Sequence, residues 1–303
     1  KKEVEMKKVN LLRSVLFCPG DRDKVIQKAL NTKSDVVIID LEDAVGQPNK
    51  INARNNVSQF LKTYQGLKQI VIRINCPHTT EWGKDDLLAL TRYNNISAIL
   101  LPKVENKDHI ESVSHLVYND IGIYKKLWAM IETPRGVLNA MNISEHQNID
   151  CLVFGSNDLT KDIKAKHTLS REPLLYAMSH CILAARASNK NVLDGVYSNY
   201  QDIEGFKTTC IQGKNLGFDG KTLIHPSQID ITNEIFTPSK EDIEFAQKVV
   251  IAWNNQTNGF GIVTVDGRMI ESLHYQEAIE VLLYAHATGY KLDDNLVLSY
   301  LTR

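Results

Sequence analysis

Residues 36–43 read VVIIDLED, a continuous run of branched apolar residues that ends abruptly in acidic side chains. A run that is apolar at every position is typical of a parallel strand covered on both faces. Seven similar runs occur along the chain, and successive runs start 22 to 41 residues apart. They are SVLFCPG (14–20), QIVIRIN (69–75), AILLPKVE (98–105), LWAMIETP (127–134), CLVFGSND (151–158), VLDGVYSN (192–199) and KTLIHPSQ (221–228).

Helical patterns separate these runs and carry recognisable end signals. Thr133 is placed to cap a helix that has Pro134 at its first position, and Asn106 precedes the pattern KDHIESV. Asn189 falls where the long helix SREPLLYAMSHCILAARASN should end. Strand followed by helix, repeated eight times, predicts an α/β fold of the (β/α)8 TIM barrel type.

The sequence after the eighth run exceeds what a barrel requires. A helical stretch, SKEDIEFAQKVVIAWNN, is followed by a glycine-rich break, NGFGIVTVDGRM, and by a closing helix from about Ser272 to Thr288. We therefore expect a catalytic barrel over residues 11–253. Residues 254–303 then form a C-terminal helical extension, a candidate lid over a neighbouring subunit.

Composition narrows the class of protein. The 303 residues carry a net charge of -1, with 43% hydrophobic and 23% charged residues, which is ordinary for a globular protein. Without a basic stripe or an apolar run of about 18 residues, neither nucleic acid nor membrane is an expected partner. Five scattered cysteines and no secretory signal predict a reducing, cytoplasmic location. Because the chain does not begin with Met, an organelle matrix is the alternative, reached through a removed presequence.

Polar side chains concentrate where the predicted strands end. They are Asp40, Glu42, Asp43, Arg73, Asn75, Lys103, Glu105, Glu132, Asp158 and His225. In a (β/α)8 barrel the carboxyl ends of the strands form the face that carries the active site. Buried carboxylates are costly without cations, so we expect Arg73 and Lys103, together with a metal ion, to balance this acidic cluster.

Glu132 and Asp158 are the best pair of metal ligands in the sequence. They end the fifth and sixth runs, and adjacent strands bring such carboxylates to one edge, where Mg2+ accepts one or two of them with water and substrate oxygens. The alternative is that each acid caps the following helix, as Asp158 could before LTKDI. Arg73 could hold a substrate carboxylate in bidentate fashion, or form a structural pair with Glu42 or Asp43.

Three further positions are open to more than one interpretation. The segment CPGDRDK could present backbone N–H groups and Arg22 to a phosphate at a helix N-terminus. Lys103 lies far from any glycine-rich loop, and a Schiff-base role is unnecessary beside a metal-bound pair of acids. His225 is either a base or ligand, or a hydrogen-bonded histidine at the rim of the barrel.

Eight segments resemble a known family in order, from about Arg13 to about Tyr290. They are RSVLFCPG, IIDLEDAV, VIRIN, ILLPKVE, IETPRGVLNA, FGSNDL, LDGVYSN and LGFDGKTLIHPSQI. Together they resemble the citrate lyase β-subunit-like branch of the HpcH/HpaI aldolase superfamily. Within that branch, TEWGKDDL (80–87), GSNDL (155–159) and DGRMIESLH (266–274) are most similar to malyl-CoA thioesterase and malyl-CoA lyase-like members.

The resemblance implies roles for individual residues. Glu132 and Asp158 would hold Mg2+, Arg73 the substrate carboxylate, and Asp40 and Glu42 would belong to the catalytic acidic segment. We expect further substrate contacts from the following residues: Arg22, Lys103, Gly155, Asn157 and His225. Glu271 stands where several members carry an Asp that a neighbouring subunit delivers as catalytic acid or base. Its alternative role is to cap the final helix.

The implied activity is Mg2+-dependent carbon–carbon cleavage of a short 3-hydroxyacyl-CoA of the malyl-, citramalyl- or citryl-CoA type. The products would be an acyl-CoA and a 2-keto acid. Three alternatives stay open: hydrolysis of malyl-CoA to malate and CoA, a CoA-independent aldolase of 2-keto acids, and a citrate lyase β subunit that works with an acyl carrier. The family also implies a homo-oligomer, either a trimer or a hexamer.

Overall fold

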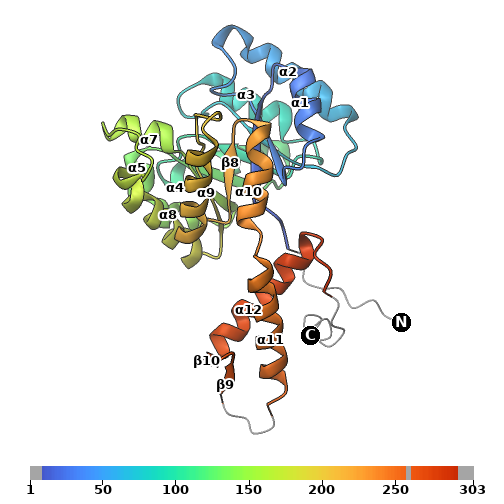
Figure 1. Ribbon diagram of the computed structural model, residues 1–303. Coiled ribbons are helices and arrows are strands. Elements are labelled where there is room, and N and C mark those ends of the chain that lie inside the picture. The colour runs from blue at the N-terminus through green and yellow to red at the C-terminus, as the bar shows by residue number, and fades with distance from the viewer. Residues whose placement is uncertain (1–8, 257–260, 293–303) are drawn as a thin grey trace. The chain divides into compact units, whose positions relative to one another are not determined.

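The computed structural model describes residues 9–256 and 261–292. Within these residues, eight parallel strands pair in chain order and β8 returns to β1, which closes a barrel (Figure 1). The strands are β1 (Ser14–Pro19), β2 (Val36–Asp40), β3 (Gln69–Arg73), β4 (Ala98–Leu101), β5 (Leu127–Ile131), β6 (Ile149–Phe154), β7 (Asn191–Asp194) and β8 (Gly220–Leu223). The predicted barrel is confirmed. The strands are shorter than the predicted segments, and β2, β3 and β7 end at their first charged residue, so most of the polar residues lie in the loops that follow.

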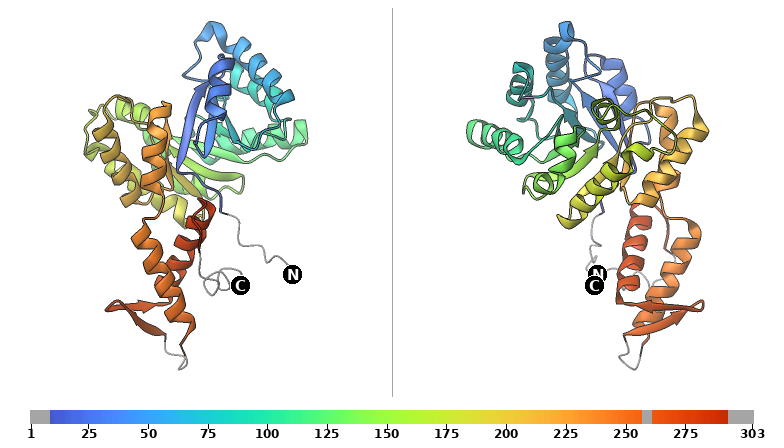
Figure 2. Two further views of the ribbon diagram at one scale, coloured as in Figure 1. Left: turned by 45° about the vertical axis from the view of Figure 1, so that its right-hand side comes forward. Right: turned by 90° about the vertical axis from the view of Figure 1, so that its left-hand side faces the viewer.

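Helices cover the outside of the barrel (Figures 1 and 2). They are α1 (Asp23–Leu30), α2 (Lys50–Thr63), α3 (Glu81–Leu90), α4 (Lys107–His115), α5 (Pro134–Leu138), α6 (Ala140–Ser144), α7 (Ser156–Asp162), α8 (Leu175–Ala187), α9 (Ile203–Leu216) and α10 (Ile229–Phe236). The predicted end signals are confirmed. The side chains of Thr133 and Asn106 each accept a backbone N–H at 3.0 Å, and Asn189 takes a left-handed φ of 54° just after α8.

Side-chain alternation along the strands divides the apolar core into two clusters. In β2, Val36 and Ile38 belong to the cluster inside the barrel, whereas Val37 and Ile39 belong to the cluster between barrel and helices. Fully burying one such side chain stabilises the fold by about 1.5–3 kcal/mol. Because successive strand residues point to opposite faces, Asp40 continues the inward series at the carboxyl end of the strand.

The C-terminal residues form a second compact unit, which begins at Thr237. It contains α11 (Lys240–Asn254), β9 (Ile262–Val265), β10 (Arg268–Glu271) and α12 (Ser272–Ala287). The sequence boundary at residue 253 therefore differs from the structural one, because α11 packs its apolar face against α12 in a separate core. Residues 257–260 and 293–303 of the predicted extension lie outside the described residues.

The predicted glycine-rich break contains a β-hairpin (Figure 2). β9 and β10 pair antiparallel through Asp266 and Gly267, which have φ values of 48° and 76°. Positive φ at both central residues is the requirement of the tight hairpin turn that Asp-Gly favours. The Asp-Gly pair is therefore the sequence signal for this hairpin, which the expectation of a glycine-rich break did not include. In the described part of the chain, no helix has the length and hydropathy to cross a membrane.

Candidate active site at the carboxyl end of the barrel

Asp40 and Arg73 form the centre of a charged cluster inside the barrel mouth. They are register partners at the ends of β2 and β3. Arg73 Nε donates to Asp40 Oδ1 at 2.7 Å and Nη2 donates to Oδ2 at 2.5 Å, while the guanidinium lies 4.8 Å from the ring centre of Phe17. Burial alone would raise the pKa of Asp40. The charge of Arg73 and the backbone N–H groups of Glu42 and Ala44 outweigh burial and hold that pKa below its ordinary value.

Glu42 lies beside this pair and is held between two cations. Lys103 Nζ donates to Glu42 Oε1 at 2.8 Å, and Arg73 Nη1 lies 3.3 Å from Oε2. Among the described residues, the buried Oε2 atom has no hydrogen-bond partner. Burial, and then the charge of Asp43, raise the pKa of Glu42 above its ordinary value despite the neighbouring cations. Glu42 therefore presents a buried acceptor that a ligand could use.

Glu132 follows β5 and continues the inward series of Trp128 and Met130. Its Oε1 atom accepts the backbone N–H of Lys103 at 2.9 Å. A Cβ atom on Gly155 would lie 2.7 Å from Glu132 Oε2, so a glycine is needed for the carboxylate to occupy this place. Burial, and then the negative charge of Glu42, raise the pKa of Glu132 to about 8. Asp158 adds to this effect, so it lies within electrostatic range of Glu132.

Asp158 lies in the first turn of α7 and is half-buried. Gly155, and not Asp158, occupies the N-cap position of this helix. The interpretation of Asp158 as a cap before LTKDI is therefore wrong, because the helix begins three residues earlier than that role requires. Its carboxylate remains available at the barrel mouth. The predicted strand end at this position is also too late, since β6 ends at Phe154.

The arrangement fits Mg2+ on three structural grounds. Glu132 is a buried carboxylate, Glu42 Oε2 is a buried acceptor without a hydrogen-bond partner in the described chain, and Gly155 leaves room for the Glu132 carboxylate. A cation near Glu132 and Asp158 would relieve the cost of these charges. The described residues include no group of three or more His, Cys, Asp or Glu side chains that could enclose a metal. Mg2+ is typically held in such open sites, by one or two carboxylates with water and substrate oxygens.

Arg73 forms a structural pair, and its role in holding a substrate carboxylate stays a prediction. Asp40 accepts hydrogen bonds from Nε and Nη2 of Arg73, so a structural pair exists. Its main acid is Asp40, and not Glu42 or Asp43 as the sequence suggested. The remaining Nη1 nitrogen lies near Met130 Sδ at 3.6 Å and Asp43 at 3.6 Å, besides Glu42. A substrate carboxylate would therefore approach Arg73 from the Nη1 side.

Other predicted residues lie around the rim. Arg22 is at the N-cap of α1 with an exposed side chain. Asn157 is exposed in the first turn of α7. His225 Nδ1 accepts the N–H of Ser227 at 3.2 Å, and its ring stacks on Tyr200 with 4.4 Å between centroids. His225 is thus a hydrogen-bonded rim histidine, while its part in substrate binding stays a prediction.

Lys50 is a site residue that the sequence analysis missed. It is buried at the start of α2, and its Nζ donates to the carbonyl oxygens of Leu41 at 2.9 Å and Glu42 at 2.6 Å. Burial lowers the pKa of Lys50. A lysine in the first turn of a helix interacts unfavourably with the helix dipole. This unusual position was the sequence feature that could have indicated a special role for Lys50.

Asn75, another of the predicted polar residues, is held by buried Asp86. Its backbone N–H and its side-chain amide both donate to the Asp86 carboxylate.

Glu271 belongs to the C-terminal unit. It is half-buried at the N-cap position of α12, and its backbone N–H donates to His274 Nδ1 at 2.9 Å. The alternative that Glu271 caps the final helix therefore agrees with its N-cap position. A catalytic role for Glu271 stays a prediction.

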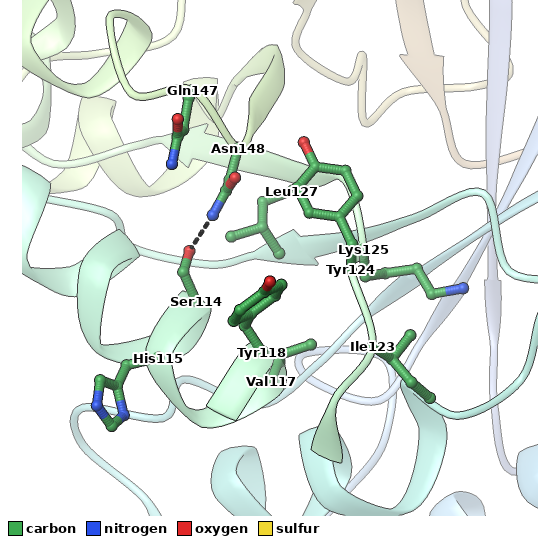
Figure 3. Close-up of a pocket in the computed structure, with 10 residues that line it drawn as sticks. All are labelled: Ser114, His115, Val117, Tyr118, Ile123, Tyr124, Lys125, Leu127, Gln147 and Asn148. Atoms are coloured by element: carbon green, nitrogen blue, oxygen red, sulfur yellow. Dashed lines mark hydrogen bonds between the residues drawn. The ribbon is translucent and has the colours of Figure 1, made fainter. Parts of the chain in front are cut away.

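Two cavities lie at different levels of the barrel. One of about 390 Å3 is lined by Ser156 and Asn157, the residues that precede Asp158 in α7. Another of about 480 Å3 is bordered by Leu127, the first residue of β5, and by Tyr118 and Tyr124 (Figure 3). This second cavity lies at the amino end of the strand, away from Glu132, and none of the predicted site residues borders it.

Comparisons with known proteins show the family to which this chain belongs. Residues 13–226 match the family model described as HpcH/HpaI aldolase/citrate lyase. A (3S)-malyl-CoA thioesterase of Cereibacter sphaeroides is 39% identical, with 91% of this chain and 95% of the relative covered. The citrate lyase subunit beta of Haemophilus influenzae is 31% identical, over 87% and 93% of the two chains. The structure of the Mycobacterium tuberculosis protein CitE with magnesium, acetoacetate and coenzyme A aligns with a TM-score of 0.73 at 28% identity, over 91% and 97%. This chain is therefore an enzyme that belongs to the HpcH/HpaI aldolase/citrate lyase family.

Proposed function

We propose that this enzyme uses Mg2+ to cleave the carbon–carbon bond of a short 3-hydroxyacyl-CoA of the malyl-CoA type. The observation that carries the proposal is the barrel mouth itself, where Glu132 and Asp158 lie within electrostatic range of each other and Arg73 is oriented by Asp40. A 2-hydroxy acid group offers a carboxylate for Arg73 and two oxygens for a metal. The magnesium, acetoacetate and coenzyme A bound by the M. tuberculosis CitE support the same ligand classes here.

Glu132 and Asp158 are the residues that would hold Mg2+. When bound, the ion supplies Lewis-acid polarisation of the substrate's 2-oxygen and a template for its carboxylate. The chain's own residues supply the rest of the binding. Arg73 offers Nη1 to the substrate carboxylate, and Asp40 keeps the guanidinium plane fixed so that little reorganisation is needed during the reaction.

Glu42 is the residue we assign as acceptor of the hydroxyl proton, because its buried Oε2 has no hydrogen-bond partner among the described residues and only the ion pair with Arg73 beside it. As that proton leaves, the bond between the hydroxyl-bearing carbon and the adjacent methylene breaks. The 2-keto acid departs, the electron pair moves into the thioester, and the resulting enolate takes up a proton on carbon. The 390 Å3 cavity beside Asn157 would take part of the remaining substrate.

Hydrolysis of the thioester is a second candidate, favoured by one specific observation. The 39% identical C. sphaeroides relatives are malyl-CoA thioesterases. In that reaction water adds to the thioester carbonyl, and malate and CoA leave. Glu271 reaches about one methylene further than an Asp and is our assignment for the residue that orients this water.

The deciding experiment is incubation of the purified protein with (S)-malyl-CoA and Mg2+, with products identified by mass spectrometry. Acetyl-CoA and glyoxylate would establish the lyase, whereas free CoA and malate would establish the thioesterase. No turnover of malyl-, citramalyl- or citryl-CoA would refute both, and would leave the carrier-dependent citrate lyase β subunit as the alternative. Activity on the free acids alone would instead establish a CoA-independent aldolase.

We further propose that the enzyme is a homo-oligomer in which the C-terminal unit of one copy supplies Glu271 to the barrel of another. The support is that this unit has its own apolar core and carries Glu271 outside the barrel unit. Mixing an inactive Glu132→Ala protein with an inactive Glu271→Ala protein tests the idea. Recovery of activity after subunit exchange is expected, and its absence in mixed oligomers would contradict the arrangement.

A further inference from the structure

Lys103 has an unusual backbone conformation at the barrel mouth. Its φ is 50°, in the left-handed region that side chains other than glycine rarely adopt. The following residues fix the loop that carries it: the N–H of Val104 donates to the carbonyl of Met130 at 3.2 Å, and Asn139 Nδ2 donates to the carbonyl of Glu105 at 2.8 Å. Strained residues of this kind persist only where the surroundings impose them, and they cluster at functional sites.

The conformation has a definite consequence for two acids. It directs the backbone N–H of Lys103 to Glu132 Oε1 at 2.9 Å, while the side chain reaches Glu42 Oε1 with Nζ at 2.8 Å. One residue therefore contacts both Glu132, the proposed metal ligand after β5, and Glu42 after β2, from a loop after β4. Glycine would adopt this φ more easily but would lose the ammonium group.

We infer that Lys103 is a positioning residue, which fixes Glu132 through its strained backbone and Glu42 through its ammonium group, and does not bind substrate. The test of this inference by turnover rests on the proposed function. The test by Mg2+ affinity does not depend on the proposed function. The ammonium group is held toward Glu42, which accepts one of its N–H groups at normal hydrogen-bond length. The KM of the variants below decides whether the remaining N–H groups of the ammonium bind substrate.

Four substitutions separate the backbone contribution from the side-chain contribution. Lys103→Arg keeps a cation and tolerates the conformation as well as lysine does. Lys103→Met and Lys103→Gly remove the cation, and both retain a backbone N–H that can point at Glu132. Lys103→Val also removes the cation. Because a β-branched residue strongly disfavours positive φ, the backbone should leave this conformation and its N–H should no longer donate to Glu132.

The first readout is Mg2+ affinity, measured by calorimetry without substrate. Loss of the cation leaves the acids less neutralised, so Lys103→Met and Lys103→Gly should bind Mg2+ about threefold more tightly or better. Lys103→Val should bind it about tenfold more weakly than Lys103→Met, because Glu132 has lost a partner. Equal affinities in Met and Val variants would overturn the backbone role.

The second readout is turnover of the substrate identified above. Lys103→Met and Lys103→Gly should lower kcat by about tenfold or more with little change in KM, and Lys103→Arg should restore most of it. A raised KM with unchanged kcat and unchanged Mg2+ affinity would overturn the inference and make Lys103 a substrate-binding residue. If the unaltered enzyme turns over none of the thioesters, the proposed function fails, while the Mg2+ measurements still decide the role of Lys103.

Discussion

The Asp40 carboxylate accepts two hydrogen bonds from the Arg73 guanidinium across neighbouring strands, at 2.7 and 2.5 Å. This pair is buried, and it leaves Nη1 as the arginine nitrogen that faces the other acids of the site. The Asp40 carboxylate thereby fixes the orientation of the Arg73 guanidinium plane, and so the direction from which a substrate carboxylate can bind to it. A direct consequence is that Asp40 should matter for catalysis without touching a metal.

Replacing Asp40 with Asn keeps the size of the side chain but removes the charge that orients Arg73. We expect kcat/KM to fall by about 100-fold, because a small misplacement of a positioning group has that effect. Mg2+ affinity should change little. Asp43→Asn is the matched control, since Asp43 is exposed and 3.6 Å from Arg73, and it should leave kcat/KM nearly unchanged. Equal losses in both variants would contradict an orienting role for Asp40.

Gly155→Ala should damage the metal site through a steric contact alone. The new Cβ would lie 2.3 Å from the Glu132 Cβ and 2.7 Å from its Oε2, so the carboxylate must move. We expect Mg2+ affinity, measured by calorimetry, to fall by about 10- to 100-fold. Gly46→Ala is the control, because its Cβ would meet only Pro48 Cδ at 3.8 Å. Unchanged Mg2+ affinity in Gly155→Ala would remove Glu132 from the metal site.

Glu132 should make the metal-free enzyme less stable as the pH rises. Its pKa is raised from 4.5 to about 8 in the folded protein, so the folded state binds more protons than the unfolded state between these values. Stability therefore falls as the pH increases through this window. Thermal unfolding in chelator at pH 6 and pH 8 measures the effect. Glu132→Gln should show a smaller decrease than the unaltered protein, and an equal decrease in both would disprove the assignment.

Asp194 should be important for folding and not for catalysis. It is fully buried on the outer face of the barrel, where it accepts from Arg171 Nη1 at 2.7 Å and from Lys221 Nζ at 2.8 Å. Burial alone would raise the pKa of Asp194, but these cations hold it below the usual 3.8. Asp194→Asn leaves two buried cations without their counter-charge, and should cost about 3–5 kcal/mol in urea unfolding at pH 7.

The pH dependence of this effect has a fixed sign. Because the folded pKa is lowered, the stabilisation by Asp194 is complete above its unfolded value and is lost as the pH falls through the folded value. The difference between the two proteins should therefore shrink in acid. Asp150→Asn breaks the exposed pair with Lys126 and is the control, with an expected cost of about 0–1 kcal/mol. A similar cost for both variants would contradict the structural role of Asp194.

The sequence was informative where one local pattern determines the outcome. The eight apolar runs predicted every barrel strand, because parallel strands covered on both faces need continuous apolar residues. Thr133 and Asn106 were predictable as caps for a similar reason, since capping depends on neighbouring residues alone.

Features that depend on distant partners could not be predicted in this way. The choice of Asp40, and not Glu42, as the main partner of Arg73 follows from the register of β2 and β3. The burial of Lys50 against the backbone of Glu42 depends on how α2 packs on the barrel. The boundary at Thr237 depends on the apolar core to which the buried residues of α11 belong. The left-handed backbone of Lys103 accompanies the hydrogen bond from its N–H to Glu132, which follows β5. Lysine has no intrinsic preference for this conformation, so the sequence could not predict it.

The measurement that most directly tests the account is a calorimetric Mg2+ titration of the Glu132→Ala/Asp158→Ala double variant beside the unaltered protein. Asp162→Asn, on the same helix as Asp158 but exposed, serves as the matched control. Loss of Mg2+ binding in the double variant, with an unchanged circular dichroism spectrum and a normal titration of the control, is the predicted result. Undiminished Mg2+ affinity in the double variant would contradict the assignment of these two carboxylates as the metal site.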